Sequence, residues 1–246
     1  IKKLYEKWAL ITNRQLATQK IACGTLAAQY LFGTTKGVMI LPNAVDIDTI
    51  ISTANRSANY IEKNFDAKGL KIIQVGRFNK VKNHAFSLEI ANELERRAIE
   101  FTMYFIGQGP LENELHHKVE KESLQHRVRF LGVRSDITEL MASADYMIMP
   151  SLHEGFPVVL VESQAVGLNA LVSNNVSTQV NFNIGLVDFL PINSVNCWVD
   201  RLLQPDKSIP IDKERLDALE ERGFNIIDSA NKISKSYKNM ISPNYL

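Results

Sequence analysis

Residues 145–167 read DYMIMPSLHEGFPVVLVESQAVG, and this one stretch contains the pattern that decides the fold. The apolar run Asp145–Met149 has the length and composition of a strand covered on both faces. A polar turn follows, and an apolar helical pattern then runs from Pro157 to Val166 and stops at Gly167. Proline is favoured in the first turn of a helix and glycine directly after its end. The stretch therefore predicts a strand, a tight turn and a helix.

The same alternation continues in both directions along the chain. Further strands are predicted at Val38–Leu41, Leu70–Val75, Phe101–Ile106, Arg127–Leu131 and Asn169–Val172, and further helices at Thr49–Lys63, His84–Arg97, Pro110–Glu122 and Asp136–Ser143. Short connections between alternating strands and helices favour a parallel sheet built from right-handed crossovers. We therefore expect an α/β fold with helices on both faces of a parallel sheet.

Both ends of the chain have a different pattern. Residues 1 to about 20 predict a polar helix, which is followed by a short strand at Lys20–Cys23 and a helix at Thr25–Phe32. Near the C-terminus an apolar stripe at helical spacing predicts a terminal helix packed on its own domain. The stripe consists of Ile226, Ala230, Ile233, Tyr237 and Ile241, and Lys232, Lys235 and Lys238 lie off it. These lysines form a solvated face or, alternatively, a contact with a membrane surface.

Composition excludes several classes of protein. The 246 residues include 28 Lys and Arg against 27 Asp and Glu, a net charge of +1, so no broad basic face for nucleic acid is expected. Cys23 and Cys197 are too few for a disulfide framework and fit a reducing compartment. No stretch approaches the roughly 18 consecutive apolar residues of a membrane-spanning helix. Because the chain begins with Ile1 and not Met, we interpret it as a processed chain or a fragment.

Four consecutive predicted strands end in glycine-rich or polar segments. These segments are Gly76–Asn83, Gly107–Pro110, Gly132–Arg134 and Pro150–Pro157. In an open parallel sheet the carboxyl ends of the strands meet at one edge, where ligands bind. A glycine directly after a strand allows a sharp turn or the close approach of a ligand. Together the four segments predict a binding crevice at this edge.

The segment from Glu154 to Glu162 indicates what the crevice binds. The helix that begins near Pro157 leaves its first backbone N–H groups without partners, and these groups suit a phosphate. Helical rise separates the two glutamates by roughly 8–12 Å, which suits two contacts along an elongated polyol. Arg77 and Lys82, which follow a neighbouring strand, supply two cations for a diphosphate. Alternatively, Glu154 is a loop carboxylate and Glu162 a solvated residue of the helix.

Two other patterns suggest a metal or a dinucleotide only weakly. Asp46-Ile47-Asp48 has the D-x-D spacing of metal-dependent transferases of another fold, but it precedes a predicted helix and fits a capping role better. Gly107 and Gly109 begin a dinucleotide fingerprint, but Glu112 stands where its third glycine belongs, so use of NAD is not expected.

The histidines do not form a metal site in the sequence. His116 and His117 are adjacent and cannot share a helix face, and the chain has no H-E-x-x-H pattern. His84 begins a predicted helix and His153 precedes Glu154. For these two we expect a surface or capping role, with contact to a phosphate as the alternative.

The segments at the strand ends resemble a known family. EGFPVVLVE at 154–162 resembles the E-x7-E signature of retaining glycosyltransferases of the GT-B fold, family 4 (group 1). VGR at 75–77 with KNH at 82–84, FIGQGP at 105–110, and FLG at 130–132 followed by Asp136 resemble three further blocks of that family, in the same order. LPNAVD at 41–46 resembles the segment that opens the donor domain, and ESQAVG at 162–167 is similar to members that build exopolysaccharide or capsule chains.

The resemblance implies a role for each residue of the crevice. It assigns Arg77 and Lys82 to the diphosphate of a nucleotide sugar, and Glu162 to the ribose hydroxyls. It places Glu154 and the segment Gly155, Phe156, Pro157 and Val158 at the donor sugar and its phosphate, Gly107 and Gly109 at the donor, and the backbone around Val133 beside the base. Arg77, Lys82 and Glu154 would be the catalytic group. No cofactor and no metal is expected, and UDP is favoured as the nucleotide.

The resemblance also implies a domain organisation. A GT-B enzyme has two Rossmann-like domains, and this chain would hold a remnant of the N-terminal acceptor domain (1–32), the donor-binding domain (33–225) and a C-terminal crossing helix (226–246). We therefore expect binding of a nucleotide sugar, and no transfer to a polysaccharide or lipid-linked acceptor by these residues alone. The expected location is the cytoplasm, with peripheral association at the inner face of the membrane as a further alternative.

Two other functions stay open at this level. The chain would also suit a nucleotide-sugar-binding module without transferase activity that acts through a partner chain. A GT-B-fold epimerase or hydrolase of nucleotide sugars is the third alternative, and release of free sugar without an acceptor would indicate it.

Overall fold

The computed structural model describes residues 2–204 and 208–241, which divide into two compact units. Unit 1 comprises residues 1–46 and 219–246, and unit 2 comprises residues 47–218. The divisions lie at other positions than the expected boundaries at 32/33 and 225/226, and the identity of the domains stays a prediction. Within the described residues, no helix is both long enough and apolar enough to span a bilayer.

Unit 2 contains a sheet of six parallel strands in the order β5-β4-β3-β6-β7-β8. The strands are β3 (Leu70–Val75), β4 (Phe101–Ile106), β5 (Val128–Gly132), β6 (Tyr146–Met149), β7 (Asn169–Ser173) and β8 (Val187–Leu190). The chain builds the sheet outward from β3 to one edge, returns to its middle with β6 and then builds toward the other edge. This doubly wound order confirms the predicted α/β fold and creates a switch point between β3 and β6.

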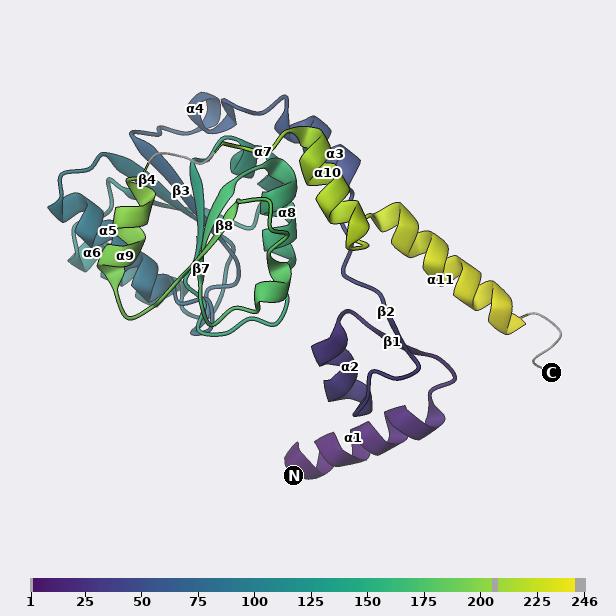
Figure 1. The fold of residues 1–246 in the computed structure, drawn as a ribbon. Helices are drawn as coiled ribbons and strands as arrows, with labels where there is room; N and C mark the ends of the chain where they lie inside the picture. Colours follow the sequence, from purple (N-terminus) through teal and green to yellow (C-terminus); the bar gives the residue numbers. More distant parts are fainter. Residues whose placement is uncertain (1, 205–207, 242–246) are drawn as a thin grey trace. The chain divides into compact units, whose positions relative to one another are not determined.

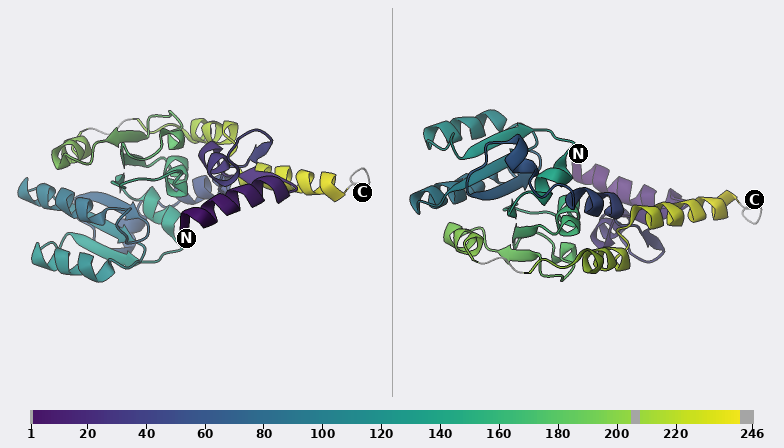
Figure 2. Two further views of the ribbon diagram at one scale, coloured as in Figure 1. Left: turned by 90° about the horizontal axis from the view of Figure 1, so that it is seen from below. Right: turned by 90° about the horizontal axis from the view of Figure 1, so that it is seen from above.

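Helices cover both faces of this sheet, as Figures 1 and 2 show. One face carries α5 (His84–Arg96), α6 (Glu112–Lys121) and α9 (Val195–Leu202), and the other carries α3 (Ile47–Ala54), α4 (Tyr60–Asn64), α7 (Ile137–Ala142) and α8 (Val158–Val166). The core under α5, α6 and α9 contains Phe105, Tyr146 and Trp198, all of which are nearly inaccessible to solvent. Burial on both faces explains why these strands have continuous apolar runs.

Four elements of unit 2 were not predicted, and one prediction was wrong. The 3₁₀ helix η1 (Thr178–Val180), the short strand β8, the helix α9 and the helix α10 (Asp212–Glu221), which continues into unit 1, had no expected counterpart. In β8 the polar Asp188 interrupts the apolar run and forms an ion pair with Arg201 of α9 at 2.7 Å. The helix predicted over Thr49–Lys63 is instead two helices, α3 and α4. The connection contains Asn55 and Asn59, residues whose side chains compete with helical hydrogen bonds.

Unit 1 contains a two-stranded parallel sheet and three further helices. The strands are β1 (Lys20–Ala22) and β2 (Val38–Ile40), and the helices are α1 (Lys2–Leu16), α2 (Thr25–Phe32) and α11 (Ile226–Ile241). A small apolar cluster of Ala22, Ala28 and Phe32 packs α2 against β1. The helix predicted from the C-terminal apolar stripe is therefore present as α11.

Candidate active site

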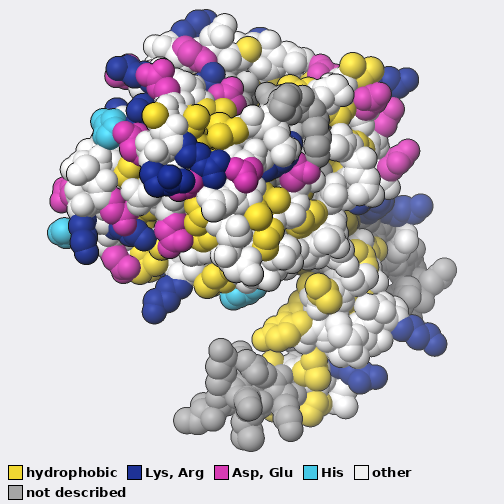
Figure 3. Space-filling view, turned by 60° about the vertical axis from the view of Figure 1, so that its left-hand side comes forward, with side chains coloured by type: hydrophobic (Ala, Val, Ile, Leu, Met, Phe, Trp, Pro, Cys, Tyr) yellow, Lys and Arg dark blue, Asp and Glu magenta, His cyan; other side chains and the backbone are white. Residues whose placement is uncertain are grey.

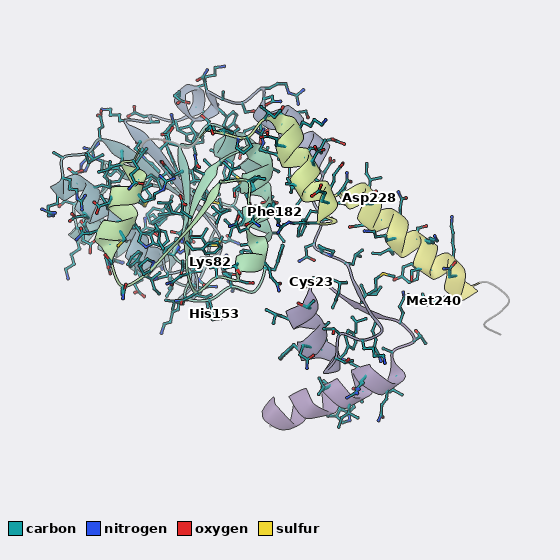
Figure 4. All side chains as sticks on the ribbon, in the orientation of Figure 1. Cys23, Lys82, His153, Phe182, Asp228 and Met240 are labelled. Atoms are coloured by element: carbon teal, nitrogen blue, oxygen red, sulfur yellow. The ribbon has the colours of Figure 1, made fainter. Side chains whose placement is uncertain are left out.

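Lys82 and Glu154 form an ion pair at the switch point of the sheet. The Lys82 Nζ lies 2.8 Å from the Glu154 Oε1, and only 17% and 19% of the two side chains is exposed. Lys82 follows β3 and Glu154 follows β6, so the pair spans the two strands between which the chain order reverses. Figure 4 shows Lys82 and His153, the residue before Glu154, at the same end of unit 2.

The absence of a side chain at Gly76 leaves space for the Lys82 side chain. It has a φ of +152°, which favours glycine, and a Cβ there would lie 2.9 Å from the Lys82 Cε. The aliphatic stem of Lys82 therefore crosses directly over the backbone of Gly76. A side chain at this position would displace the ammonium group from Glu154.

Hydrogen bonds join the Lys82 loop to the segment that follows β6. The Leu152 amide donates to the Val81 carbonyl at 2.8 Å, and the Asn83 side chain donates to the Pro150 carbonyl at 3.0 Å. Asn83 has a left-handed backbone conformation, which asparagine tolerates better than most residues do. The loop is thus attached to its neighbour on both sides of Lys82.

Arg77 lines a cleft at the adjoining strand ends. The cleft has a volume of about 730 Å³ and is lined by Arg77, Gly107, Gln108, Gly109, Pro110, Glu112 and Val133. Four predicted site residues, Arg77, Gly107, Gly109 and Val133, therefore meet at one place. Within the described residues, the side chains of Arg77 and Glu112 have neither a hydrogen bond nor an ion pair, so both charges are available to a ligand.

The loops that form this cleft contact one another through backbone atoms. A Cβ at Gly107 would collide with the Gly76 carbonyl, and one at Gly109 would collide with the backbone of Phe78. The Phe78 amide donates to the Gln108 carbonyl at 3.0 Å, and the Gly107 amide donates to the Gly132 carbonyl at 2.8 Å. Backbone atoms therefore hold the loops after β3, β4 and β5 in contact with one another.

The helix α8 begins at the segment that contains Glu154. Pro157 precedes the helix and no side chain caps it, so the first backbone N–H groups of α8 lack the partner that a cap supplies. Glu154 itself is held by a backbone bridge to Val176, and its carbonyl accepts from the Ser177 amide at 3.2 Å. Gly167 ends the helix with a φ of +91°, as predicted.

Glu162 lies within α8 and is partly buried. Burial raises the pKa of its carboxyl group above the usual value. It is therefore not the fully solvated helix residue of the alternative interpretation. Lys82, Gly155 and Glu162 are not among the residues that line the Arg77 cleft. The convergence of Arg77, Lys82 and the Gly155 segment on one diphosphate thus stays a prediction.

His84 does not have the expected surface or capping role. It is 2% exposed, and its ring lies 4.8 Å from that of Phe78 and 5.1 Å from that of Phe105, in edge-to-face contact. Burial, with a smaller contribution from the Lys82 charge, lowers the pKa of His84 to about 3, so the ring is neutral. Its position at the start of an apolar helix face was the signal that indicated burial. His153, in contrast, is exposed.

The D-x-D pattern at 46–48 begins a helix, as the capping interpretation expected. Asp48 lies in the first turn of α3. Among the residues that the structure describes, no group of three or more His, Cys, Asp and Glu side chains could hold a metal ion. Acidic and basic side chains are interspersed over the face of the molecule seen in Figure 3.

Sequence reasoning missed two side chains at this edge of the sheet. Gln108 and Glu112 line the cleft, and only the glycines around them were singled out. The signal for Glu112 was its place in the first turn of a helix that follows a glycine-rich strand end.

A doubly wound α/β domain with charged side chains at its switch point belongs to the class of open-sheet domains whose ligands bind at the carboxyl ends of the strands. A family model described as "Glycosyl transferases group 1" matches residues 56–183, just over half of the chain. The chain therefore belongs to the group 1 glycosyltransferase family, as its resemblance at the strand ends implied.

Two proteins of similar sequence also have names that describe glycosyltransferases. The chain is 38% identical over 194 residues to the putative glycosyltransferase EpsF of Bacillus subtilis, covering 76% of this chain and 50% of that protein. It is 27% identical over 256 residues to the UDP-Gal:alpha-D-GlcNAc-diphosphoundecaprenol alpha-1,3-galactosyltransferase of Escherichia coli, covering 97% of this chain and 65% of that protein. The chain thus spans about half to two thirds of the length of these relatives.

The fold is similar to that of solved GT-B glycosyltransferases. The crystal structure of Anabaena HepE in complex with UDP and glucose superposes with a TM-score of 0.74 at 16% identity, covering 97% of this chain and 67% of that one. At this identity the likeness shows the fold alone.

Proposed function

We propose that this chain is the donor-binding part of a retaining, metal-independent glycosyltransferase. It would bind a nucleoside diphosphate sugar, with UDP favoured, from which a sugar is moved to a polysaccharide or lipid-linked acceptor. The observation that carries the proposal is the Lys82–Glu154 ion pair at the switch point, beside a cleft in which the Arg77 guanidinium has no partner among the described residues. Family membership supports the class of reaction.

The proposed chemistry is electrostatic. As the bond between the sugar and the diphosphate breaks, negative charge grows on the leaving diphosphate. Arg77, Lys82 and the first amides of α8, which no side chain caps, would stabilise that charge, and fixed donors are most effective where they need not reorganise. Two cations and a helix N-terminus supply what a divalent ion supplies elsewhere, which supports metal independence.

The other residues would orient the donor. In the structure Lys82 is paired with Glu154, so binding of a diphosphate would have to share or replace this contact. Glu154 and the segment 155–158 would then contact the sugar, and Glu162 the ribose hydroxyls. The backbone at Gly107, Gly109 and Val133 would lie against the nucleotide, because these residues line the cleft with Arg77.

The names of the relatives suggest the substrates. The Escherichia coli relative is named for a UDP-galactose donor and a diphosphoundecaprenol-linked acceptor, and HepE was crystallised with UDP. By analogy we infer a UDP-sugar donor and a saccharide or lipid-linked acceptor for the protein to which this chain contributes. A nucleotide-sugar donor and a lipid-linked acceptor would together require the cytoplasm and the inner face of the membrane.

We further infer that the two ends of the chain belong with the acceptor domain. Residues 1–32 and the described part of 226–246 both fall in unit 1, whereas the proposed donor site lies entirely in unit 2. This grouping supports the assignment of 1–32 as acceptor-domain residues and of 226–246 as a helix that crosses back to that domain. Transfer would then require more of the acceptor domain than the chain contains.

Calorimetric titration tests the binding step. The chain is expected to bind UDP and UDP-sugars more tightly than it binds uridine, because the negative charge of the diphosphate is attracted to Arg77 and Lys82. Absence of any preference for diphosphates over the nucleoside would refute the proposal.

An assay with the acceptor half of a relative supplied as a separate chain tests the transfer step. Transfer only in the presence of that half supports the transferase, and binding without transfer supports a module that acts through a partner. Free sugar released without acceptor supports an epimerase or hydrolase. Transfer by the 246 residues alone would show that the inference of inactivity is wrong.

A further inference from the structure

A glutamine lies in the middle of the sheet, on a strand that is otherwise apolar near its centre. Gln74 belongs to β3, follows Ile72 and Ile73, and is 2% exposed. A buried amide costs free energy unless its donors and acceptor are satisfied. An apolar residue at this position would avoid that cost, so the amide is expected to have a specific role.

The Gln74 side chain makes two hydrogen bonds, and one of them reaches the site. Its Nε2 donates to the backbone carbonyl of Lys82 at 2.8 Å. Its Oε1 accepts from the Ser87 hydroxyl at 2.6 Å, and Ser87 is fully buried in α5. Because a carbonyl can only accept, the network fixes which end of the amide faces Lys82. Gln74 therefore connects strand β3 to Lys82, the residue whose ammonium pairs with Glu154.

Two further contacts make the position of Lys82 depend on this carbonyl. The Lys82 amide donates to the Asn79 Oδ1 at 3.0 Å, so both backbone groups of Lys82 are held by side chains. The stem then crosses Gly76, and the ammonium meets Glu154. A shift of the carbonyl would therefore displace the start of the side chain, whose stem lies where a Cβ of residue 76 would stand.

We propose that Gln74 is a positioning residue for Lys82: it fixes the Lys82 backbone through the Nε2 contact and so holds the ammonium where a diphosphate would bind. Ser87 orients the Gln74 amide for this task. The inference rests on the proposed function for its ligand, but the placement of Lys82 can be measured without any ligand.

The test compares two buried glutamines. Gln74→Met keeps the volume and removes the amide. Gln164→Met is the matched control, because Gln164 is also fully buried and also donates to backbone carbonyls, those of Leu160 and Val180. Both variants should lose thermal stability, which excludes a general loss of stability as the cause of any difference between them.

Ligand-free NMR gives the first measurement. Lysines are ¹³C-dimethylated, which preserves their charge, and the Lys82 signal is assigned with Lys82→Arg. The Lys82 signal should shift in Gln74→Met and stay in place in Gln164→Met. An unmoved Lys82 signal in folded Gln74→Met overturns the proposal, whatever the chain binds.

Titration with UDP gives the second measurement. Gln74→Met should weaken UDP binding about fivefold, the effect of one hydrogen bond, and should have no further effect in a Lys82→Ala background. An equal loss in both backgrounds would show that Gln74 acts independently of Lys82 and would overturn the proposal. If the unmodified chain does not bind UDP, the proposed function fails, and the NMR result alone decides whether Gln74 positions Lys82.

Discussion

The Lys82 ammonium lies 2.8 Å from the Glu154 carboxylate, although the two residues follow different strands of the sheet. Without ligand the two charges neutralise each other. A diphosphate would bring two or more negative charges to this place, and the carboxylate would then compete with the ligand for Lys82. A ligand that binds here must therefore interact more favourably with the Lys82 ammonium than Glu154 does.

Lys82→Ala is expected to weaken UDP binding by roughly 1.5–3 kcal/mol, the range for hydrogen bonds to a charged group. The variant also leaves the Glu154 carboxylate without its cation beside the ligand's phosphates, which favours the upper part of that range. Lys80→Ala is the matched control, because Lys80 is exposed on the same loop and should have a much smaller effect. Unchanged affinity of Lys82→Ala in calorimetry would remove Lys82 from the binding site.

Gly107→Ala is expected to destabilise unit 2 by about 2 kcal/mol or more, since the residue combines a strained backbone with a collision. Its φ is +138°, and a Cβ would meet the Gly76 carbonyl. Gly155→Ala should change stability by less than about 0.5 kcal/mol, because nothing lies within 4 Å of its Cβ position. Urea unfolding of both variants measures the difference, and equal midpoints would contradict the close packing of the two loops.

Glu162→Gln should increase stability at neutral pH and weaken nucleotide binding. Burial raises the pKa of the Glu162 carboxyl, so its ionisation opposes folding. A group with a raised pKa in the folded state contributes stability below its unfolded pKa and loses that contribution as the pH rises through the folded value. The stability gain of the variant should therefore be present at pH 7 and disappear near pH 4.

The binding role of Glu162 has a separate measurement. Glu162→Ala should weaken UDP binding more than pyrophosphate binding, since only UDP carries the ribose. Equal losses for the two ligands would contradict the ribose assignment.

Asp136→Asn should reduce stability at pH 7 and have less effect at pH 2. Hydrogen bonds from Arg134, with a further one from Tyr60, lower the pKa of Asp136 to about 2. A depressed pKa contributes stability above the unfolded value of about 3.9, and this contribution is lost as the pH falls through the folded value. Thermal melts between pH 2 and 7 measure the difference, with exposed Asp66→Asn as the control. Parallel curves for the two variants would contradict the shift.

Much of the fold could be predicted because its strands are buried on both faces. The strands β3 and β4 were predicted to the residue, since their apolar runs end at glycines. The strand β8 was missed because Asp188 interrupts its run, and that charge is compensated by Arg201 of a later helix. Such a partner is visible only once the chain has folded.

The site was predictable in part for the same reason. Glycines and prolines at strand ends indicated the crevice, because backbone conformation depends on residue type. The contact between Lys82 and Glu154 was not predictable, since it depends on the order of strands in the sheet. The role of Gln74 was hidden, because a single polar residue in a strand does not indicate what it binds.

The backbone contacts among Gly76, Phe78, Gly107 and Gly109 constrain how this edge of the sheet can diverge. The loops touch through main-chain atoms. Inserting or deleting even one residue would therefore separate these atoms and leave a gap that neighbouring side chains could not fill. Point substitutions at the cleft-lining residues Gln108, Glu112 and Val133 leave these backbone contacts in place. Under the proposed function, donor preference should therefore change over evolutionary time by exchange of side chains at constant loop length, and laboratory redesign of the cleft can follow the same route.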